Sequence, residues 1–88
     1  MNLNRVILFG KLKNLSPQGF IEVSISSEMT PQIFREEVAK VLSSINPKFK
    51  GISELNSSAV ANDSRIIFEN EPIGTSHEYF LLPPICGG

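Results

Sequence analysis

The chain has 88 residues, of which 41% are apolar and 19% are charged, and its formal net charge is −1. This length predicts one domain, residues 1–88, with a modest hydrophobic core, and the near-zero charge disfavours nucleic-acid binding as the main role. The single cysteine, Cys86, excludes an internal disulfide and favours a reducing compartment, and no apolar run approaches the roughly 20 residues of a membrane helix, so a cytoplasmic location is expected.

Two strands are predicted at the start of the chain. Residues 6–9, VILF, form a continuous apolar run, which is typical of a central strand buried on both faces. Residues 10–19 supply turn chemistry with glycine, asparagine and proline. Residues 20–26 then alternate between apolar and polar side chains, which predicts a half-buried strand that pairs with the first as a hairpin.

One amphipathic helix follows. Thr30 is a good N-cap residue, and Pro31 is tolerated at the first helical position because its missing N–H would be unpaired there. The helix is predicted to end before Asn46-Pro47. Its apolar residues recur at spacings of three and four: Phe34, Val38, Val41, Leu42 and Ile45. Residues 47–57 are polar and are expected to form a surface connection.

Three short strands complete the predicted elements, at residues 58–61, 65–68 and 78–82. Residues 70–76 contain Pro72 and Gly74 and indicate a loop. The last strand, EYFLL, is apolar on both faces and is therefore expected to lie in the middle of the sheet.

The order strand-strand-helix-strand-strand-strand predicts an α+β fold with a mixed sheet of four to five strands packed on one main helix. The first and last strands should lie side by side. This is the ubiquitin-like β-grasp arrangement. The order alone does not exclude a ferredoxin-like plait, although that fold normally has two helices.

The chain ends with LPPICGG, residues 82–88. Prolines end a sheet strand, and composition alone favours a frayed terminus. A functional interpretation is also open. Pro83-Pro84 favours an extended chain, and Gly87 and Gly88 have no side chains, so this tail (residues 83–88) would fit a narrow channel. The carboxylate of Gly88 is a poor electrophile until it is adenylated, after which sulfur or an amine can attack it.

Three stretches carry a specific resemblance: residues 5–10 (RVILFG), 59–62 (AVAN) and 78–88 (EYFLLPPICGG). They resemble the ThiS/MoaD sulfur carriers, the family of the small subunit of molybdopterin synthase. Three departures stand out. Cys86 occupies a position where the family usually has Ser or Thr, Ser76-His77-Glu78 replaces a usual Gly-Asp-Glu, and Asp63-Ser64 replaces a more glycine-like turn.

The resemblance implies a cycle in which this chain is a non-catalytic subunit of a sulfurtransferase complex. A ubiquitin-activating-type adenylyltransferase (MoeB-like) uses ATP to adenylate the Gly88 carboxylate. A sulfur donor enzyme then supplies the sulfur of a thiocarboxylate. The large synthase subunit (MoaE-like) takes this sulfur for the dithiolene of molybdopterin. The resemblance implies no cofactor or metal bound by this chain itself, and His77 with Cys86 does not make a metal cluster.

The resemblance also implies a partner surface beside the tail. Phe9 and Leu82 match apolar positions of that surface, Lys13 matches a basic position, and Phe80 is a weaker candidate. Phe9 and Leu82 as core residues remain the alternative, although one helix covers only part of one sheet face, and an exposed apolar patch favours a partner site. The tail residues expected to enter the partner's site are Pro83, Pro84, Ile85, Cys86, Gly87 and Gly88.

Three other functions stay open. The chain would serve another sulfur pathway, such as thiazole synthesis, tRNA thiolation or cysteine synthesis, through the same chemistry. A ubiquitin-like modifier would be activated identically but joined to lysines by isopeptide bonds. A plain interaction module would not use its glycines at all. Cys86 is expected to be a small filler, although its position two residues before Gly88 would also suit an acceptor of persulfide sulfur.

Overall fold

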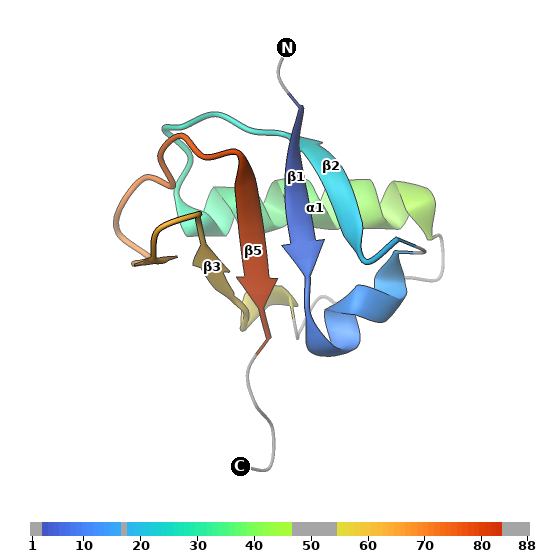
Figure 1. The fold of residues 1–88 in the computed structure, drawn as a ribbon. Coiled ribbons are helices and arrows are strands. Elements are labelled where there is room, and N and C mark those ends of the chain that lie inside the picture. The colour runs from blue at the N-terminus through green and yellow to red at the C-terminus, as the bar shows by residue number, and fades with distance from the viewer. Residues whose placement is uncertain (1–2, 17, 47–54, 84–88) are drawn as a thin grey trace.

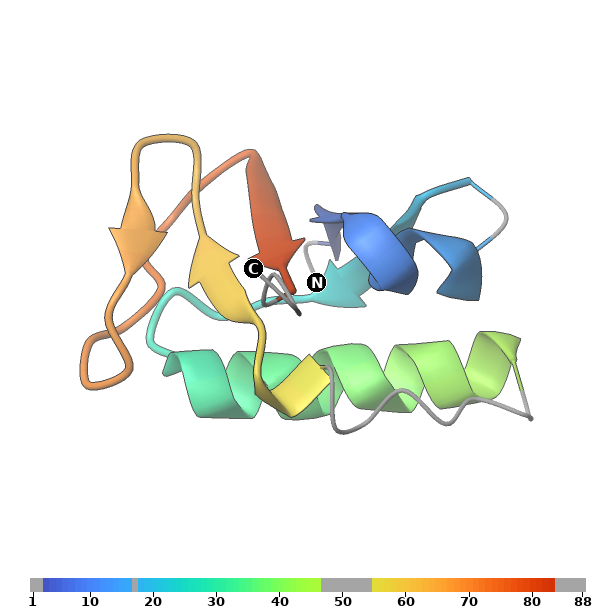
Figure 2. The same ribbon diagram turned by 90° about the horizontal axis from the view of Figure 1, so that it is seen from below.

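The computed structural model describes residues 3–16, 18–46 and 55–83. It is a five-stranded sheet with one long helix across one face, as Figures 1 and 2 show. The strands are β1 (Leu3–Leu8), β2 (Phe20–Ser24), β3 (Ala59–Ala61), β4 (Ile66–Ile67) and β5 (Glu78–Leu82). The helices are the 3-10 helix η1 (Gly10–Leu15) and the α-helix α1 (Pro31–Ile45).

The strand order is β2-β1-β5-β3-β4. β1 pairs antiparallel with β2 and parallel with β5, and β3 pairs antiparallel with both β5 and β4. The two apolar strands therefore lie side by side in the middle of the sheet, as their sequences predicted. A mixed sheet of this order on one main helix is the ubiquitin-like β-grasp fold, so the predicted fold class is confirmed.

The core lies between the sheet and α1. Alternate residues of the strands face the helix, because successive side chains of a strand point to opposite faces. Phe34, Val38 and Leu42 of α1 are fully buried against them, and the ring of Phe34 lies 5.5 Å from the ring of Tyr79. Ile45, predicted to share this apolar face, is 47% exposed in the last turn of the helix.

The bounds of α1 agree with the sequence prediction at both ends. Thr30 is the N-cap residue and Pro31 is the first helical residue, but the Thr30 side chain makes no capping hydrogen bond. The Thr30 carbonyl instead accepts a hydrogen bond from the N–H of Phe34. Among the described residues, no helix is both long and apolar enough to cross a membrane.

A buried cation, Arg35, joins α1 to the end of the sheet that β3 and β4 form. Arg35 is 4% exposed, and its guanidinium makes a bidentate ion pair with Glu69, with 2.8 Å between Nη1 and Oε1. Its Nε donates a hydrogen bond to the carbonyl of Ser58 at 2.8 Å. The Arg35 guanidinium lowers the pKa of the Glu69 carboxyl below its ordinary value. This pair fixes the segments on either side of β3 and β4 onto the helix.

Several predicted segments differ from the structure. The first strand, predicted at residues 6–9, is β1 at Leu3–Leu8, and Leu55, within the expected surface connection, is fully buried. The predicted turn at residues 10–19 contains η1, because the apolar Leu12 is drawn into the core, where it is fully buried. The second strand ends at Ser24 rather than residue 26, because the chain turns where the Met29 N–H bonds to the Ser26 carbonyl. β4 has two residues rather than four, because the flanking residues belong to turns: the N–H of Arg65 donates to the Asn62 side chain, and the carbonyl of Phe68 accepts from the N–H of Glu71.

Candidate functional site

The face of the sheet that α1 does not cover carries a row of apolar side chains, and Figure 1 views the sheet from this side. The pairing of the strands places one residue of each strand opposite its neighbours in this row. From β2 to β4 the row consists of Phe20, Ile7, Phe80, Ala61 and Ile66. A nonpolar band therefore crosses the whole sheet on the side away from the helix.

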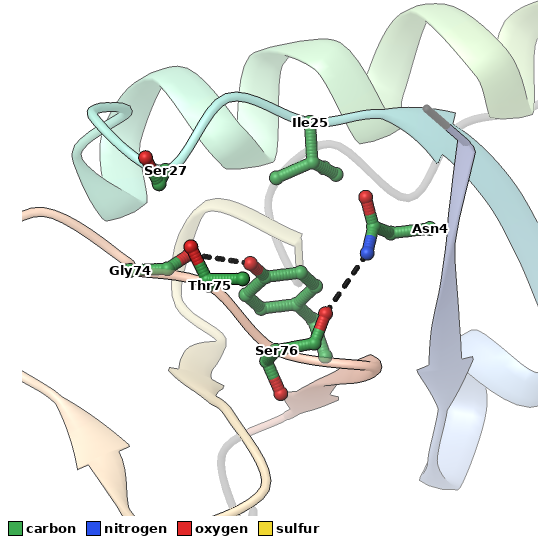
Figure 3. A pocket seen from close by; sticks show the side chains of 7 residues that line it. Asn4, Ile25, Ser27, Gly74, Thr75 and Ser76 are labelled. Carbon is green, nitrogen blue, oxygen red and sulfur yellow. Dashed lines mark hydrogen bonds between the residues drawn. The ribbon is translucent and has the colours of Figure 1, made fainter. Parts of the chain in front are cut away.

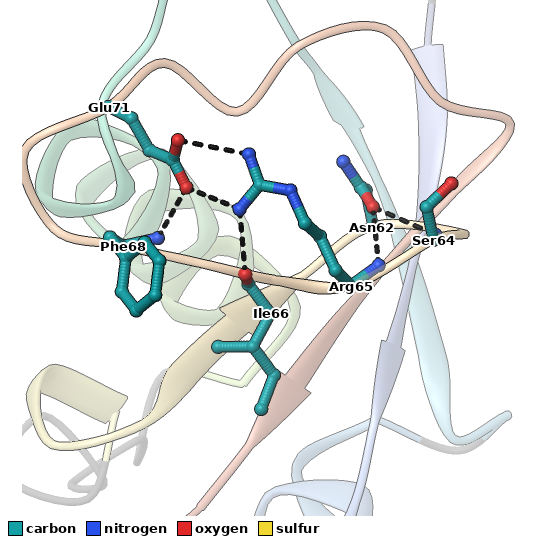
Figure 4. A network of polar contacts seen from close by, with 6 residues as sticks. All are labelled: Asn62, Ser64, Arg65, Ile66, Phe68 and Glu71. Carbon is teal, nitrogen blue, oxygen red and sulfur yellow. Dashed lines mark hydrogen bonds and ion pairs between the residues drawn. The ribbon is translucent and has the colours of Figure 1, made fainter.

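Several of these side chains are open to solvent. Phe9 is 41% exposed, and its ring lies 6.1 Å from the ring of Phe80. Ile66 is 54% exposed and Phe68 is 69% exposed, and Figure 4 shows both side chains pointing to the same side of the chain. We define the open-face patch as Ile7, Phe9, Phe20, Ile66, Phe68, Phe80 and Leu82. Contiguous exposed apolar area of this kind marks sites where other proteins bind.

A charged row borders the patch on the side away from the tail. Arg5 pairs in register with Glu22 and with Glu78. Its guanidinium lies 3.8 Å from the Glu78 carboxylate and 4.4 Å from the centre of the Phe20 ring. A cation over an aromatic face is attractive, so this arginine links the polar border to the apolar band.

The structure brings three of the predicted contact residues together. Phe9 lies just beyond β1, and Phe80 and Leu82 lie on β5, all on the open face, where Phe80 and Leu82 are half-buried. Lys13 is exposed on η1, where its side chain runs beside Gly19. The predictions for Pro84, Ile85, Cys86, Gly87 and Gly88 fall outside the described residues, and Pro83 is half-buried at the end of β5.

The outer edge of the sheet, at β4, is occupied by a polar network, which Figure 4 shows. Arg65 and Glu71 form a bidentate ion pair, with distances of 2.6 and 2.9 Å. The Arg65 Nη1 also donates to the carbonyl of Ile66, and the N–H of Phe68 donates to Glu71. The Arg65 guanidinium and, to a lesser extent, the Phe68 N–H lower the pKa of the Glu71 carboxyl to about 2.

An Asx turn leads the chain into this network. The Asn62 side-chain carbonyl accepts hydrogen bonds from the N–H groups of Ser64 and Arg65, at 2.8 and 3.0 Å. Asparagine favours such turns because its short side chain reaches the backbone two residues on. Arg65 is thereby held where its guanidinium reaches Glu71.

Sequence analysis missed Ile7, Phe20, Ile66 and Phe68 as members of the surface. For Ile7 the signal was present, because alternation puts it on the same side as Phe9. Phe20 has the same signal through its alternation with the buried Ile21. The short β4 offers too few residues for its face to be assigned without knowing its partner strand.

A hollow of about 220 Å³ lies at the end of the sheet opposite the tail, and Figure 3 shows its lining. Asn4 donates a hydrogen bond to the carbonyl of Ser76 at 2.9 Å, and the Tyr79 hydroxyl donates to the carbonyl of Gly74. Burial raises the pKa of the Tyr79 hydroxyl above its ordinary value. All seven lining residues are uncharged, and these hydrogen bonds tie the loop before β5 to the sheet.

Comparison with known proteins gives matches by structure. No protein-family model matches the sequence, and no curated protein is similar to it by sequence. A crystal structure of SAMP1 from Haloferax volcanii is 18% identical, with a TM-score of 0.65 over 99% of this chain and 100% of that one. A second crystal structure, of small archaeal modifier protein 1 from H. volcanii, is 16% identical, with a TM-score of 0.66 over 97% and 100% of the two chains.

A third solved structure carries a different name. It is a protein assigned as molybdopterin converting factor, subunit 1, from Pyrococcus furiosus. It is 16% identical, with a TM-score of 0.63 over 97% of this chain and 100% of that one. At such identities the similarity establishes the fold. This chain therefore shares, over almost its whole length, the ubiquitin-like β-grasp fold of an archaeal modifier protein and of a protein assigned as molybdopterin converting factor, subunit 1.

Proposed function

We propose that this protein is a carrier that acts through the carboxylate of Gly88, as the last residue of the working protein. One observation carries the proposal. β5 leads the chain out of the sheet at Pro83, and its last residues, Phe80 and Leu82, belong to the open-face patch. A partner that binds this patch would sit where the segment leading to Gly87 and Gly88 begins.

The chemistry requires no catalytic group on this chain. ATP, used by a ubiquitin-activating-type adenylyltransferase, converts the Gly88 carboxylate to an acyl-adenylate and releases pyrophosphate. Sulfide then attacks the acyl carbonyl, a carbon–sulfur bond forms, AMP leaves, and the product is a thiocarboxylate. Glycine suits the last two positions, because a chain without side chains passes through a narrow channel. We propose no cofactor or metal on this chain.

The finer proposal is that the protein is the small subunit of molybdopterin synthase, working in the cytoplasm. The sequence LPPICGG and the structural similarity to the Pyrococcus furiosus protein support it. The proposed partners are a large synthase subunit, an adenylyltransferase and a sulfur donor enzyme. Phe9, Phe80 and Leu82 would contact the large subunit, with Lys13 beside them. The residues that would enter its active site are Pro83, Pro84, Ile85, Cys86, Gly87 and Gly88.

A ubiquitin-like modifier is the second candidate, and the similarity to small archaeal modifier protein 1 of H. volcanii favours it equally. Activation of Gly88 would follow the same steps. The acyl group would then pass to the amine of a lysine on a target protein and form an isopeptide bond. The two candidates differ in the nucleophile that receives the activated carbonyl.

The product distinguishes them. The protein is incubated with ATP, Mg²⁺, sulfide and the adenylyltransferase of its own genome, and its intact mass is measured. Replacement of one oxygen by one sulfur at Gly88 supports the sulfur carrier. Covalent ladders that form when an extract of the source cells is added in place of sulfide support the modifier. A variant extended by one residue beyond Gly88 is the control, because its Gly88 carboxyl is an amide. If neither product forms, or if the extended variant reacts equally without being processed, the proposal is wrong.

A further inference from the structure

Gly10 and Pro83 are in contact at the point where the chain leaves the sheet. The parallel pairing of β1 and β5 ends with Leu8 opposite Leu81. Two residues further on, Gly10 comes to lie beside Pro83. At this point β1 has to turn aside into η1, while β5 continues towards the C-terminus.

The space between these two residues admits no side chain on Gly10. Its φ is +60°, in the left-handed region that favours glycine. A Cβ placed on Gly10 would lie 2.9 Å from Cγ of Pro83 and 3.9 Å from Cδ. The shorter distance is below any that real Cβ atoms adopt, so the proline ring packs directly against the backbone of Gly10.

The Gly10 side of this contact is held firmly. The N–H of Leu12 donates to the carbonyl of Phe9 at 3.1 Å, and the Leu12 side chain is fully buried. The N–H of Leu8 donates to the carbonyl of Gly19 at 3.0 Å. If a side chain were added at Gly10, Pro83 would therefore be the part that moves.

Pro83 has no N–H to continue the hydrogen-bond ladder between β5 and its neighbours. Its direction is set by its own ring, which fixes φ, and by what the ring packs against. The backbone of Gly10 is that surface. The direction of the chain at Pro83 therefore depends on the absence of a side chain at Gly10.

We propose that Gly10 is a positioning residue for the reaction at Gly88. By admitting the Pro83 ring against the start of η1, it fixes the direction in which the chain leaves the open-face patch for the partner's active site. This inference rests on the proposed function. In the activation step, an oxygen of the Gly88 carboxylate attacks the α-phosphorus of ATP, a new oxygen–phosphorus bond forms, and pyrophosphate leaves. A misplacement of about 1 Å can cost such a step 10²-fold.

The test compares Gly10→Ala with Gly74→Ala. Gly74 has a φ of +74°, and a Cβ there would meet no atom within 4 Å. Both variants place alanine in the left-handed backbone conformation, but only the Cβ of Gly10→Ala would clash with Pro83. With the adenylyltransferase of the same genome, we expect kcat/KM for ATP–pyrophosphate exchange to fall about tenfold for Gly10→Ala relative to Gly74→Ala.

A third variant tests whether Gly10→Ala acts through the Pro83 ring. Pro83→Ala removes the ring atoms that an added Cβ would strike. It will change activation by itself, because Pro83 belongs to the proposed tail. In the Pro83→Ala background, however, we expect Gly10→Ala to cause no further loss. A tenfold loss that persists in the double variant would mean that Gly10 acts by another route, and the inference would be wrong.

A second measurement does not depend on the enzyme. Cys86 is the only cysteine in the sequence, so a nitroxide label attached to it reports where the tail lies. We expect Gly10→Ala, but not Gly74→Ala, to shift the set of backbone amides whose NMR signals the label attenuates. If Gly10→Ala attenuates the same amides as the unmodified protein, the inference is wrong. It is also wrong if the attenuated amides differ but kcat/KM for ATP–pyrophosphate exchange equals that of Gly74→Ala. If the unmodified protein is not adenylated at all, the proposed function fails, and the label separately shows whether Gly10 directs the tail.

Discussion

Phe9 and Phe80 stack their rings across the parallel pair of central strands, with centroids 6.1 Å apart and planes tilted by 33°. Such aromatic pairs contribute about 0.5–1.5 kcal/mol beyond the area that they bury. Phe9 nevertheless remains 41% exposed. The pair is therefore ordered by the fold and still has apolar area available for a partner, next to the point where the chain leaves β5.

We predict that Leu82→Asp raises the Kd for a large synthase subunit at least tenfold, which corresponds to about 1.4 kcal/mol of binding free energy. The physical reason is that a carboxylate at the centre of an apolar contact would have to lose its hydration without gaining a partner. Isothermal titration calorimetry measures the change.

Ile33→Asp is the matched control for this variant. Ile33 is 47% exposed, but it lies on α1, which covers the opposite face of the sheet. The Kd of the Ile33→Asp variant for the large subunit should stay within about twofold of that of the unmodified protein. A twofold change in Kd corresponds to roughly 0.4 kcal/mol. If the two substitutions weaken binding equally, or if neither does, the partner does not use the open-face patch.

The ion pair of Arg65 and Glu71 protects the free edge of the sheet. An unpaired edge strand is a template for association with another chain. Two backbone groups at this edge, the Ile66 carbonyl and the Phe68 N–H, are hydrogen-bonded to these two side chains. We predict that Arg65→Ala exposes the edge and produces self-association that increases with concentration in sedimentation velocity experiments.

Lys40→Ala provides the comparison, because it removes a surface cation whose ion pair with Glu37 lies within α1 and involves no strand. It should sediment like the unmodified protein. An Arg65→Ala variant that sediments identically to Lys40→Ala would show that the ion pair does not guard the edge.

The sequence was sufficient for features that depend on local pattern. The bounds of α1 were predicted correctly at both ends, because Pro31, the apolar spacing and Asn46-Pro47 all act within the helix or beside it. The central position of β1 and β5 followed from their continuous apolar runs. Alternation along these strands also placed Phe80 and Leu82 on one side.

Features that depend on register were not predictable. The contact of Gly10 with Pro83 arises only when β1 and β5 pair in parallel with Leu8 opposite Leu81. Ile66 is on the open face because it pairs with Ala61, and nothing in the sequence around either residue predicts this pairing. The 3-10 helix η1 was hidden among turn residues, because the burial of Leu12 by itself gives no periodicity.

We predict that Glu69→Gln lowers the free energy of unfolding by about 1 kcal/mol, measured by urea denaturation at pH 7. The substitution leaves the buried Arg35 guanidinium with a weaker, neutral partner. The loss stays small because the Glu69 side chain is 61% exposed and water screens the pair. Glu37→Gln, which breaks the exposed pair with Lys40, should lower the free energy of unfolding by less than Glu69→Gln does. Equal losses for both variants would show that burial of Arg35 adds nothing to its ion pair.

The last prediction concerns pH. The pKa of Glu71 falls from an ordinary value of 4.5 to about 2 in the folded protein, because Arg65 and the Phe68 N–H stabilise its ionised form. A carboxyl group whose pKa is lower in the folded than in the unfolded protein stabilises the fold at pH values above its unfolded pKa. This stabilisation is lost as the pH falls through its folded pKa. The contribution of Glu71 should therefore be complete above about pH 4.5 and disappear as the pH approaches 2.

Comparison with Glu71→Gln isolates this contribution from that of Glu69, whose pKa is lowered as well. The free energies of unfolding of the unmodified protein and of Glu71→Gln are measured by urea denaturation of dilute samples across this range of pH. The difference between them should be constant at neutral pH and shrink steadily between pH 4.5 and 2, because protonation makes the two side chains alike in charge. A difference that stays constant down to the acid limit would mean that the carboxylate of Glu71 is not held in its ionised form by Arg65.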